Sequence, residues 1–205
     1  MGVLNLAKES KIKDEIAEIL KNILKDESFK IDDSSKKLEV VTEKSVRYLI
    51  DEKPPTRGEN AFNVDILIFL KNTENQKNDD KILKDDEIPF VVIEVKGSKK
   101  ITTDEIITYS GKAERHKRVY PWLRYGIIWN STKEPNIPFR FFKNNENVDF
   151  AYNINEISKN KMNDKIKKFY SEILKDQVEI AIKLYEIFKK GSKDIEIYSS
   201  LIKIK

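Results

Sequence analysis

Apolar residues recur at the spacing of an amphipathic helix in four stretches of the chain. In the first stretch, Ile12, Ile16 and Leu20 fall on one face, and Ser10 is a candidate N-cap. In the last stretch, a broad apolar stripe ends at Gly191, a residue type that often terminates helices. The predicted helices cover residues 10–25, 35–52, 103–118 and 162–190.

The helix predicted over residues 35–52 rests on an apolar stripe that includes Leu38 and Val41. It is expected to end before Pro54-Pro55, because proline lacks a backbone N–H and crowds the preceding turn. We therefore expect a helix to precede the apolar residues 62–70.

Shorter apolar runs that are rich in branched and aromatic residues predict β-strands. Three such runs cover residues 62–70 (FNVDILIFL), 89–97 (PFVVIEVKG) and 124–130 (RYGIIWN). Residues 138–142 and 147–152 are predicted to pair as a hairpin across Asn144-Asn145, whereas the polar residues 71–88 predict a loop. This order of elements predicts a mixed central sheet flanked by helices, which is an α/β fold with a long C-terminal helix.

The composition limits the chemistry of any catalytic site. The chain has no cysteine, which excludes disulfides, thiolate metal sites and cysteine nucleophiles. The chain has a single histidine, His116, which argues against a histidine-based zinc site and against Ser-His catalysis. A metal ion would therefore be held by oxygen, which indicates magnesium, manganese or calcium.

Charge and hydropathy say less about partners and location. Lys+Arg (39) and Asp+Glu (35) nearly cancel, so the net charge of +4 is weak evidence for a polyanionic partner. The N-terminus lacks the pattern of a signal peptide, and no apolar stretch is long enough to span a bilayer. We therefore expect a cytoplasmic protein without membrane contact.

Three charged residues lie inside runs that otherwise predict buried strands. Asp65 interrupts residues 62–70, and Glu94 and Lys96 lie two positions apart in residues 89–97. Strand side chains alternate, so Glu94 and Lys96 point to the same face, where Asp65 can join them if the strands are neighbours. A charge inside an apolar strand is costly unless it is paired or binds a metal. The alternative is a solvent-facing strand edge with a weak ion pair, or a strand-end turn in the case of Asp65.

Two carboxylates beside a lysine have a clear chemical use. Asp65 and Glu94 can hold a hard divalent cation through oxygen, and the backbone carbonyl of Val95 can add a ligand. The cation would stabilise charge on a phosphate, and Lys96 would orient or deprotonate the attacking water. These residues therefore predict Mg²⁺-dependent hydrolysis of phosphodiester bonds, with Mn²⁺ able to substitute.

This pattern resembles the PD-(D/E)xK nuclease superfamily, in which an acid at the end of one strand precedes acid-any-Lys on the next. Asp65 and Glu94-Val95-Lys96 carry the resemblance, and Val64 stands where the name-giving proline would be. The predicted element order is also similar to that superfamily's core: a helix, a hairpin of strands that carries the motif, a helix and a further strand.

The resemblance implies a restriction-endonuclease-like core over residues 35–130. Residues 1–34 and 131–205 would then be helical and hairpin additions for packing, DNA contact or dimerisation. All of these segments are expected to belong to one nuclease domain over residues 1–205.

Members of the superfamily often use a further acid from the helix before the hairpin. Glu39 and Glu43 are the candidates here, and Glu43 is preferred because it is nearer the expected edge of the sheet. Glu59 is a third option. A solvated helix face explains Glu39 and Glu43 equally well.

Residues 112–125 (KAERHKRVYPWLRY) combine cationic and aromatic side chains. Together with two lysines after the motif strand, they could line a phosphate-binding face. The alternative is a solvated helix face whose aromatic residues anchor the next strand, and Trp122 and Tyr125 fit a core position better. The candidate DNA-binding residues are Lys99, Lys100, Lys112, Arg115, His116, Lys117, Arg118 and Arg124.

Within the superfamily, the chain is most similar to a type II restriction endonuclease. This similarity implies cleavage of double-stranded DNA at a fixed sequence, a homodimer that matches a palindromic site, and a cognate methyltransferase. The alternatives are a structure-specific nuclease of the same superfamily, such as a junction resolvase or repair nuclease, and a non-catalytic nucleic-acid-binding protein.

Overall fold

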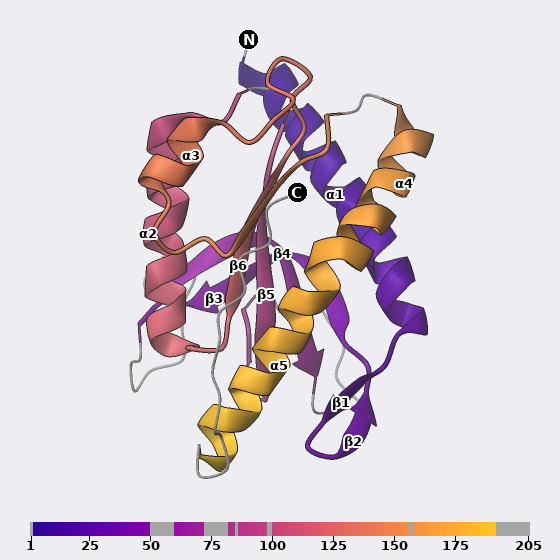
Figure 1. The fold of residues 1–205 in the computed structure, drawn as a ribbon, viewed down its shortest axis with the longest axis vertical. Helices are drawn as coiled ribbons and strands as arrows, with labels where there is room; N and C mark the ends of the chain where they lie inside the picture. The colour runs from indigo at the N-terminus through magenta and orange to yellow at the C-terminus, as the bar shows by residue number, and fades with distance from the viewer. Residues whose placement is uncertain are drawn as a thin grey trace.

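The computed structural model describes residues 2–49, 60–71, 82–84, 86–97, 100–155 and 158–191. Over these residues the chain forms a central five-stranded sheet with helices on both faces (Figure 1). This arrangement confirms the predicted α/β fold with a mixed sheet. Among the described residues, no helix is both long and apolar enough to cross a membrane.

The sheet has the strand order β3-β4-β5-β6-β7. Its strands are β3 (Glu39–Arg47), β4 (Ala61–Lys71), β5 (Glu87–Lys96), β6 (Arg124–Trp129) and β7 (Phe150–Asn153). The pairs β3–β4 and β4–β5 are antiparallel, whereas β5–β6 and β6–β7 are parallel. The strands predicted over residues 62–70, 89–97 and 124–130 are confirmed as β4, β5 and β6.

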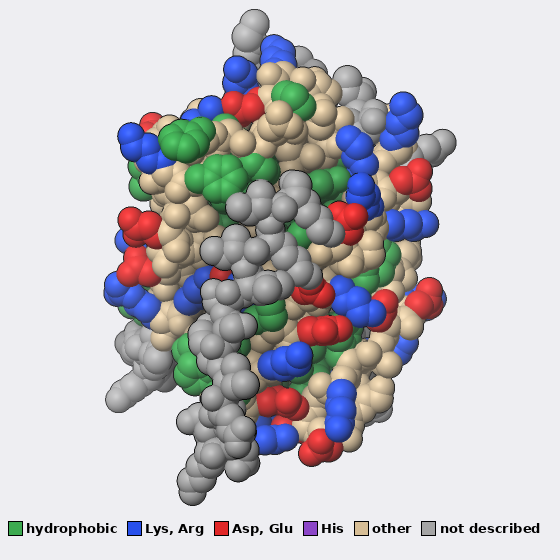
Figure 2. All heavy atoms as spheres, viewed as in Figure 1, with side chains coloured by type: hydrophobic (Ala, Val, Ile, Leu, Met, Phe, Trp, Pro, Cys, Tyr) green, Lys and Arg blue, Asp and Glu red, His purple; other side chains and the backbone are tan. Residues whose placement is uncertain are grey.

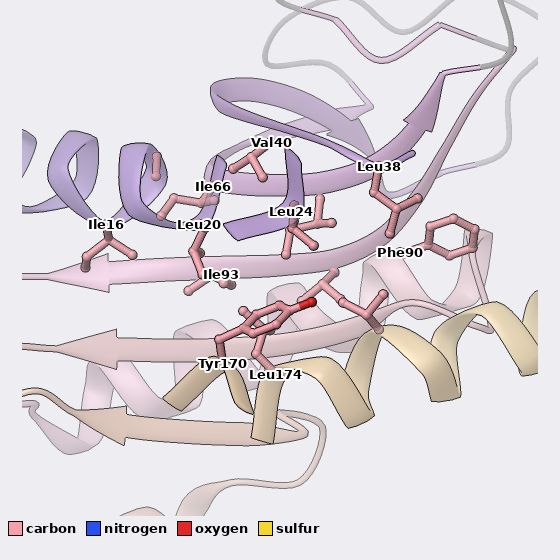
Figure 3. Packing of buried hydrophobic residues seen from close by; sticks show 14 of the residues in the cluster. Ile16, Leu20, Leu24, Leu38, Val40, Ile66, Phe90, Ile93, Tyr170 and Leu174 are labelled. Carbon is pink, nitrogen blue, oxygen red and sulfur yellow. The ribbon is translucent and has the colours of Figure 1, made fainter. Parts of the chain in front are cut away.

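Long helices cover one face of the sheet. They are α1 (Gly2–Asp26), α4 (Lys159–Phe169), the π-helical turn η1 (Tyr170–Leu174) and α5 (Lys175–Lys190). Figure 3 shows Ile16 and Leu20 of α1 packed towards Ile66 and Ile93 of the sheet. Leu174 of η1 belongs to the same core. Branched side chains on one face of β4 and β5 therefore pack against the apolar faces of α1 and α5.

Two helices, α2 (Thr103–Val119) and α3 (Phe139–Asn144), cover the opposite face. The N-terminus of α2 is fixed by a capping box in which Thr102 and Glu105 satisfy each other's backbone N–H groups. Ile106, Tyr109 and Ala113 turn inward and pack on the sheet. The helix predicted over residues 103–118 is thus confirmed.

The structure corrects several sequence-based predictions. The helix predicted over residues 35–52 is wrong, because Glu39–Arg47 form strand β3. Pro54-Pro55, where that helix was expected to end, lie outside the described residues. Ser10 lies inside α1 and not at its N-cap. The hairpin predicted between residues 138–142 and 147–152 is wrong, because Phe139–Asn144 form the helix α3 and β7 pairs with β6 instead. A small hairpin of β1 (Phe29–Ile31) and β2 (Ser34–Lys36) was not predicted.

The long helix predicted over residues 162–190 is confirmed with one irregularity. The π-helical turn η1 interrupts it between α4 and α5, and Gly191 ends it with a positive φ of 85°. Glycine tolerates that backbone conformation because it has no Cβ.

Candidate active site

The candidate site forms where β4 separates from β5. The recorded pairing of these strands ends at Ile66–Ile93, whereas the pairing of β4 with β3 continues to Ala61. Beyond this point the side chain of Asp65 replaces the backbone ladder, and its Oδ2 accepts a hydrogen bond from the N–H of Val95 at 2.8 Å. The fork therefore places Asp65 directly against the Glu94-Val95-Lys96 segment.

Glu94 is buried on the α2 side of the fork, with only 3% of its surface exposed. Its Oε1 accepts a hydrogen bond from the hydroxyl of Tyr125 at 2.6 Å and lies 3.4 Å from Nζ of Lys112. Burial raises the pKa of Glu94 to about 7, the charge of Lys112 opposes that rise, and the neighbouring Asp65 adds to it. The two predicted acids thus lie together, as expected from strand pairing.

Lys96 follows Glu94 on the same face of β5, as strand alternation predicts. Its Nζ lies 4.0 Å from Oε1 of Glu105 and 5.5 Å from the centroid of the Tyr109 ring. Burial and the charge of Glu94 raise the pKa of Tyr109 above its ordinary value, so its hydroxyl stays protonated. Lys96 therefore lies beside Glu105 and Tyr109, and 27% of its side chain is exposed to solvent.

The donor set of the fork fits a hard divalent cation. The N–H of Val95 donates to Oδ2 of Asp65, and Tyr125 and Lys112 contact Oε1 of Glu94. A side-chain hydrogen bond also joins Asp65 to Glu94, and a cation bound between the two carboxylates would take its place. The N–H and C=O of one strand residue point to the same side, so the carbonyl of Val95 is directed towards Asp65 as well. The described residues contain no group of three or more Asp, Glu, His or Cys side chains suited to a metal. A cation here would be held by two carboxylates, with the carbonyl and water completing the shell.

Glu43 occupies a strand and not the predicted helix. The register pairs Thr42 with Ile66 and Lys44 with Val64, so Glu43 lies across from Asp65. However, Glu43 has a positive φ of 55°, and its carboxylate pairs with Lys13 of α1 at 2.6 Å.

Glu39 is no better placed as an extra acid. It pairs with Phe69, four positions from Asp65, which is about 13 Å along a strand. The structure therefore brings neither Glu39 nor Glu43 into the carboxylate pair, and Glu59 lies outside the described residues.

The predicted basic residues divide into two groups. Lys112 and Arg115 lie on α2 next to the fork, over the ring of Phe62, at 5.8 Å and 5.7 Å from its centroid. Lys117 and Arg124 instead form ion pairs with Asp149. These two cations join α2 and β6 to the segment before β7, which is a structural role.

The remaining basic candidates differ in burial. His116 is fully buried, and its ring lies beside those of Phe62 and Tyr125, with 5.6 Å and 5.8 Å between centroids. Arg118 pairs with Glu114 along the exposed side of α2, and Lys100 is exposed. Lys99 lies outside the described residues. On the face drawn in Figure 2, described Lys and Arg side chains alternate with Asp and Glu, so those side chains form no continuous basic surface there.

No protein-family model matches this chain, and no curated protein is significantly similar to it. Neither comparison assigns the chain to a family. A functional assignment therefore rests on the residues and the geometry of the fork.

Several residues of the fork were not predicted as site residues. Tyr125 was interpreted as a core residue, and it is buried, but its hydroxyl reaches Glu94. Tyr48 and Phe62 stack on each other, 4.1 Å between ring centroids, beneath Arg115. The sequence held one signal for Tyr125, because a buried tyrosine hydroxyl needs a hydrogen-bond partner.

The burial of His116 predicts a loss of stability in acid. Its Nδ1 donates a hydrogen bond to the carbonyl of Arg47, 2.8 Å away, and burial lowers its pKa from 6.5 to about 4. When the pH is lowered below the ordinary pKa, His116 binds a proton in the unfolded chain but not in the folded protein. Lowering the pH through this window therefore decreases the stability of the folded protein. We expect His116 to account for about 2 kcal/mol of unfolding free energy lost between roughly pH 7 and pH 5.

Urea unfolding at both pH values, on wild type and His116→Gln, measures this contribution. Glutamine has no titratable group, so the variant is expected to lose less stability than wild type over the same pH interval. An equal loss in both proteins would show that His116 is not held neutral.

Proposed function

We propose that this protein is a metal-dependent nuclease that hydrolyses phosphodiester bonds of DNA. The observation that carries the proposal is the fork itself, where Asp65 and the buried Glu94 lie together with Lys96 on the same face. Burying Glu94 beside a second carboxylate has a free-energy cost, which a bound cation would offset.

The chain's own residues have distinct roles in the proposed reaction. Asp65 and Glu94 would hold a divalent cation, which would supply Lewis acidity towards a phosphoryl oxygen. Lys96 orients the attacking water, since it follows Glu94 on the same face of β5 and its side chain is partly exposed. The water oxygen attacks phosphorus and releases a proton to solvent, the bond from phosphorus to the leaving oxygen breaks, and the leaving oxygen takes up a proton.

The order of elements supports the resemblance to the PD-(D/E)xK superfamily. From the antiparallel pair that carries the acids (β4 and β5), the chain continues to a crossover helix (α2) and a parallel strand (β6), which is the order that the resemblance implies for this part. Before the pair, strand β3 stands where a helix was expected, and the hairpin of β1 and β2 separates β3 from the helix α1. The narrower assignment to type II restriction endonucleases rests on the sequence resemblance alone.

Lys112 and Arg115 are the cations best placed to bind the backbone of the nucleic acid. They lie one helical turn apart on α2, and Lys112 also contacts Glu94. Both lie over Phe62, which limits the side-chain freedom lost when a phosphate binds. The surface that these two residues form is therefore the proposed phosphate contact next to the scissile bond.

Replacing Arg115 with glutamine is expected to weaken DNA binding at every sequence tested. Each phosphate contact that is lost should reduce the slope of log K against log salt by about 1. Fluorescence anisotropy with a labelled duplex, in Ca²⁺ to prevent cleavage, measures the slope. Lys183→Gln on α5 is the matched control, since Lys183 is exposed on the opposite layer. Equal slopes for wild type and Arg115→Gln would exclude Arg115 from the phosphate contact.

A panel of substrates tests the proposal and decides its subclass. Purified protein is incubated with plasmid duplex, branched DNA, single-stranded DNA and RNA, each with Mg²⁺ and with EDTA, beside Asp65→Asn. Discrete duplex fragments that require Mg²⁺ and Asp65 support a restriction endonuclease, and cleavage of branched DNA alone supports a resolvase or repair nuclease. Binding to nucleic acid without cleavage of any substrate contradicts the nuclease and leaves a binding protein.

A further inference from the structure

The carboxylate of Glu94 is fixed by a residue outside the acid-any-Lys motif. Tyr125 lies on β6, the neighbouring parallel strand, and its hydroxyl is 2.6 Å from Oε1 of Glu94. Both side chains are almost completely inaccessible to solvent. This hydrogen bond is therefore shielded from competing water, which strengthens it relative to an exposed one.

Tyr125 is itself held in place by its surroundings. Its ring stacks beside that of His116, with 5.8 Å between centroids and 23° between planes. The donor is thus held rigidly by packing, and it contacts Oε1 of Glu94.

We propose that Tyr125 is a positioning residue for the cation site, because its hydroxyl holds Oε1 of Glu94 and leaves the other oxygen directed to a cation shared with Asp65. This inference rests on the proposed function, since it requires Glu94 to be a cation ligand. Carboxylate ligands of metals are commonly oriented by such hydrogen bonds. Tyr125 does not touch the substrate, and it acts only through Glu94.

Lys112 contacts the same oxygen but cannot replace the hydroxyl. Its Nζ is 3.4 Å from Oε1, at the limit of a hydrogen bond, and about a quarter of its side chain is exposed. A flexible ammonium group at that distance supplies charge and little orientation. Lys112 should therefore not compensate for the loss of the Tyr125 hydroxyl.

Mn²⁺ binding to the purified full-length chain tests this inference, measured by isothermal titration calorimetry and by electron paramagnetic resonance. The variants are Tyr125→Phe, which keeps the ring beside His116, and Tyr152→Phe as the matched control. Tyr152 loses a hydroxyl that contacts the carbonyl of Lys165, on the opposite layer from the site. Circular dichroism confirms that each variant is folded.

We expect the Kd for Mn²⁺ to rise about 10- to 100-fold in Tyr125→Phe and to stay unchanged in Tyr152→Phe. The cleavage deficit of Tyr125→Phe should then disappear at saturating Mn²⁺, which a general structural defect would not show. Wild-type affinity in a folded Tyr125→Phe would overturn the positioning role while leaving the proposed function intact. Failure of the wild type itself to bind Mn²⁺ would overturn both.

Discussion

Replacing Glu94 with glutamine is expected to reduce Mg²⁺-dependent cleavage at least about 1,000-fold. The cation supplies several kcal/mol of stabilisation to the charged transition state, and a neutral amide is a much weaker ligand than a carboxylate. The initial rate of plasmid nicking at saturating Mg²⁺ measures the effect. Glu114→Gln is the control, because Glu114 is an exposed acid on α2 that pairs with Arg118 away from the fork.

The same substitution is expected to stabilise the protein when no cation is bound. The pKa of Glu94 is raised from 4.5 to about 7 in the folded state, so its contribution to stability is present below the lower value and lost as the pH rises through the higher one. At about pH 8 the ionised carboxyl then costs about 3 kcal/mol, and glutamine removes that cost. Glutamine can accept from Tyr125 and donate to Asp65, so no buried group loses its partner.

Urea unfolding in EDTA measures this stability. Glu94→Gln should unfold at a higher urea concentration than wild type, and the difference should shrink when Mg²⁺ is added to both. A variant that is inactive and also less stable in EDTA would indicate a structural role for Glu94. Retention of cleavage would remove Glu94 from the catalytic centre.

Replacing Lys96 with methionine is expected to reduce the cleavage rate about 100- to 10,000-fold without weakening cation binding. Lys96 acts on the attacking water and not on the metal, and removing its positive charge leaves the carboxylates no less attractive to a cation. Parallel measurements of cleavage rate and of Mn²⁺ affinity separate these roles. Methionine retains the length of the side chain beside Tyr109, so packing is preserved.

Lys183→Met serves as the control for Lys96→Met, because Lys183 is exposed on α5, on the opposite layer from the site. The control should cleave at nearly the wild-type rate. If Lys96→Met lost cleavage and Mn²⁺ affinity to the same degree, Lys96 would be a support of the metal site and not a group that acts on water.

The motif strands could be predicted because each local signal agreed with the fold. Runs of branched residues in β4 and β5 are buried on both faces, so the embedded Asp65 and Glu94 stood out as costly charges. The spacing of apolar residues over 103–118 predicted α2 in the same way. These signals depend only on neighbouring residues, which is why sequence alone was sufficient.

Strand β3 could not be predicted because its alternation is broken. The positive φ at Glu43 shifts the pleat, so Val40 packs with α1 on one face and Val46 with α2 on the other. Two residues six positions apart then face opposite layers, and the spacing of the remaining apolar residues imitates a helix. Nothing local to the sequence marks Glu43 for this conformation.

The basic segment of α2 was only partly predictable, since the partners of its cations come from distant parts of the chain. Asp149 binds both Lys117 and Arg124, which removes them from the proposed DNA contact. The role of Tyr125 depends in the same way on the parallel pairing of β5 with β6. Charge and aromatic content identify a segment, whereas the fold decides which of its side chains reach the fork.

Cleavage of supercoiled plasmid by wild type and Glu94→Gln, compared in Mg²⁺ and in EDTA, tests the central claim most directly. The proposal predicts cleavage by wild type in Mg²⁺ alone, with no product above background from the variant or in EDTA. Cleavage that persists in EDTA, or that is equal in the two proteins, would contradict a cation-dependent nuclease centre at Asp65, Glu94 and Lys96.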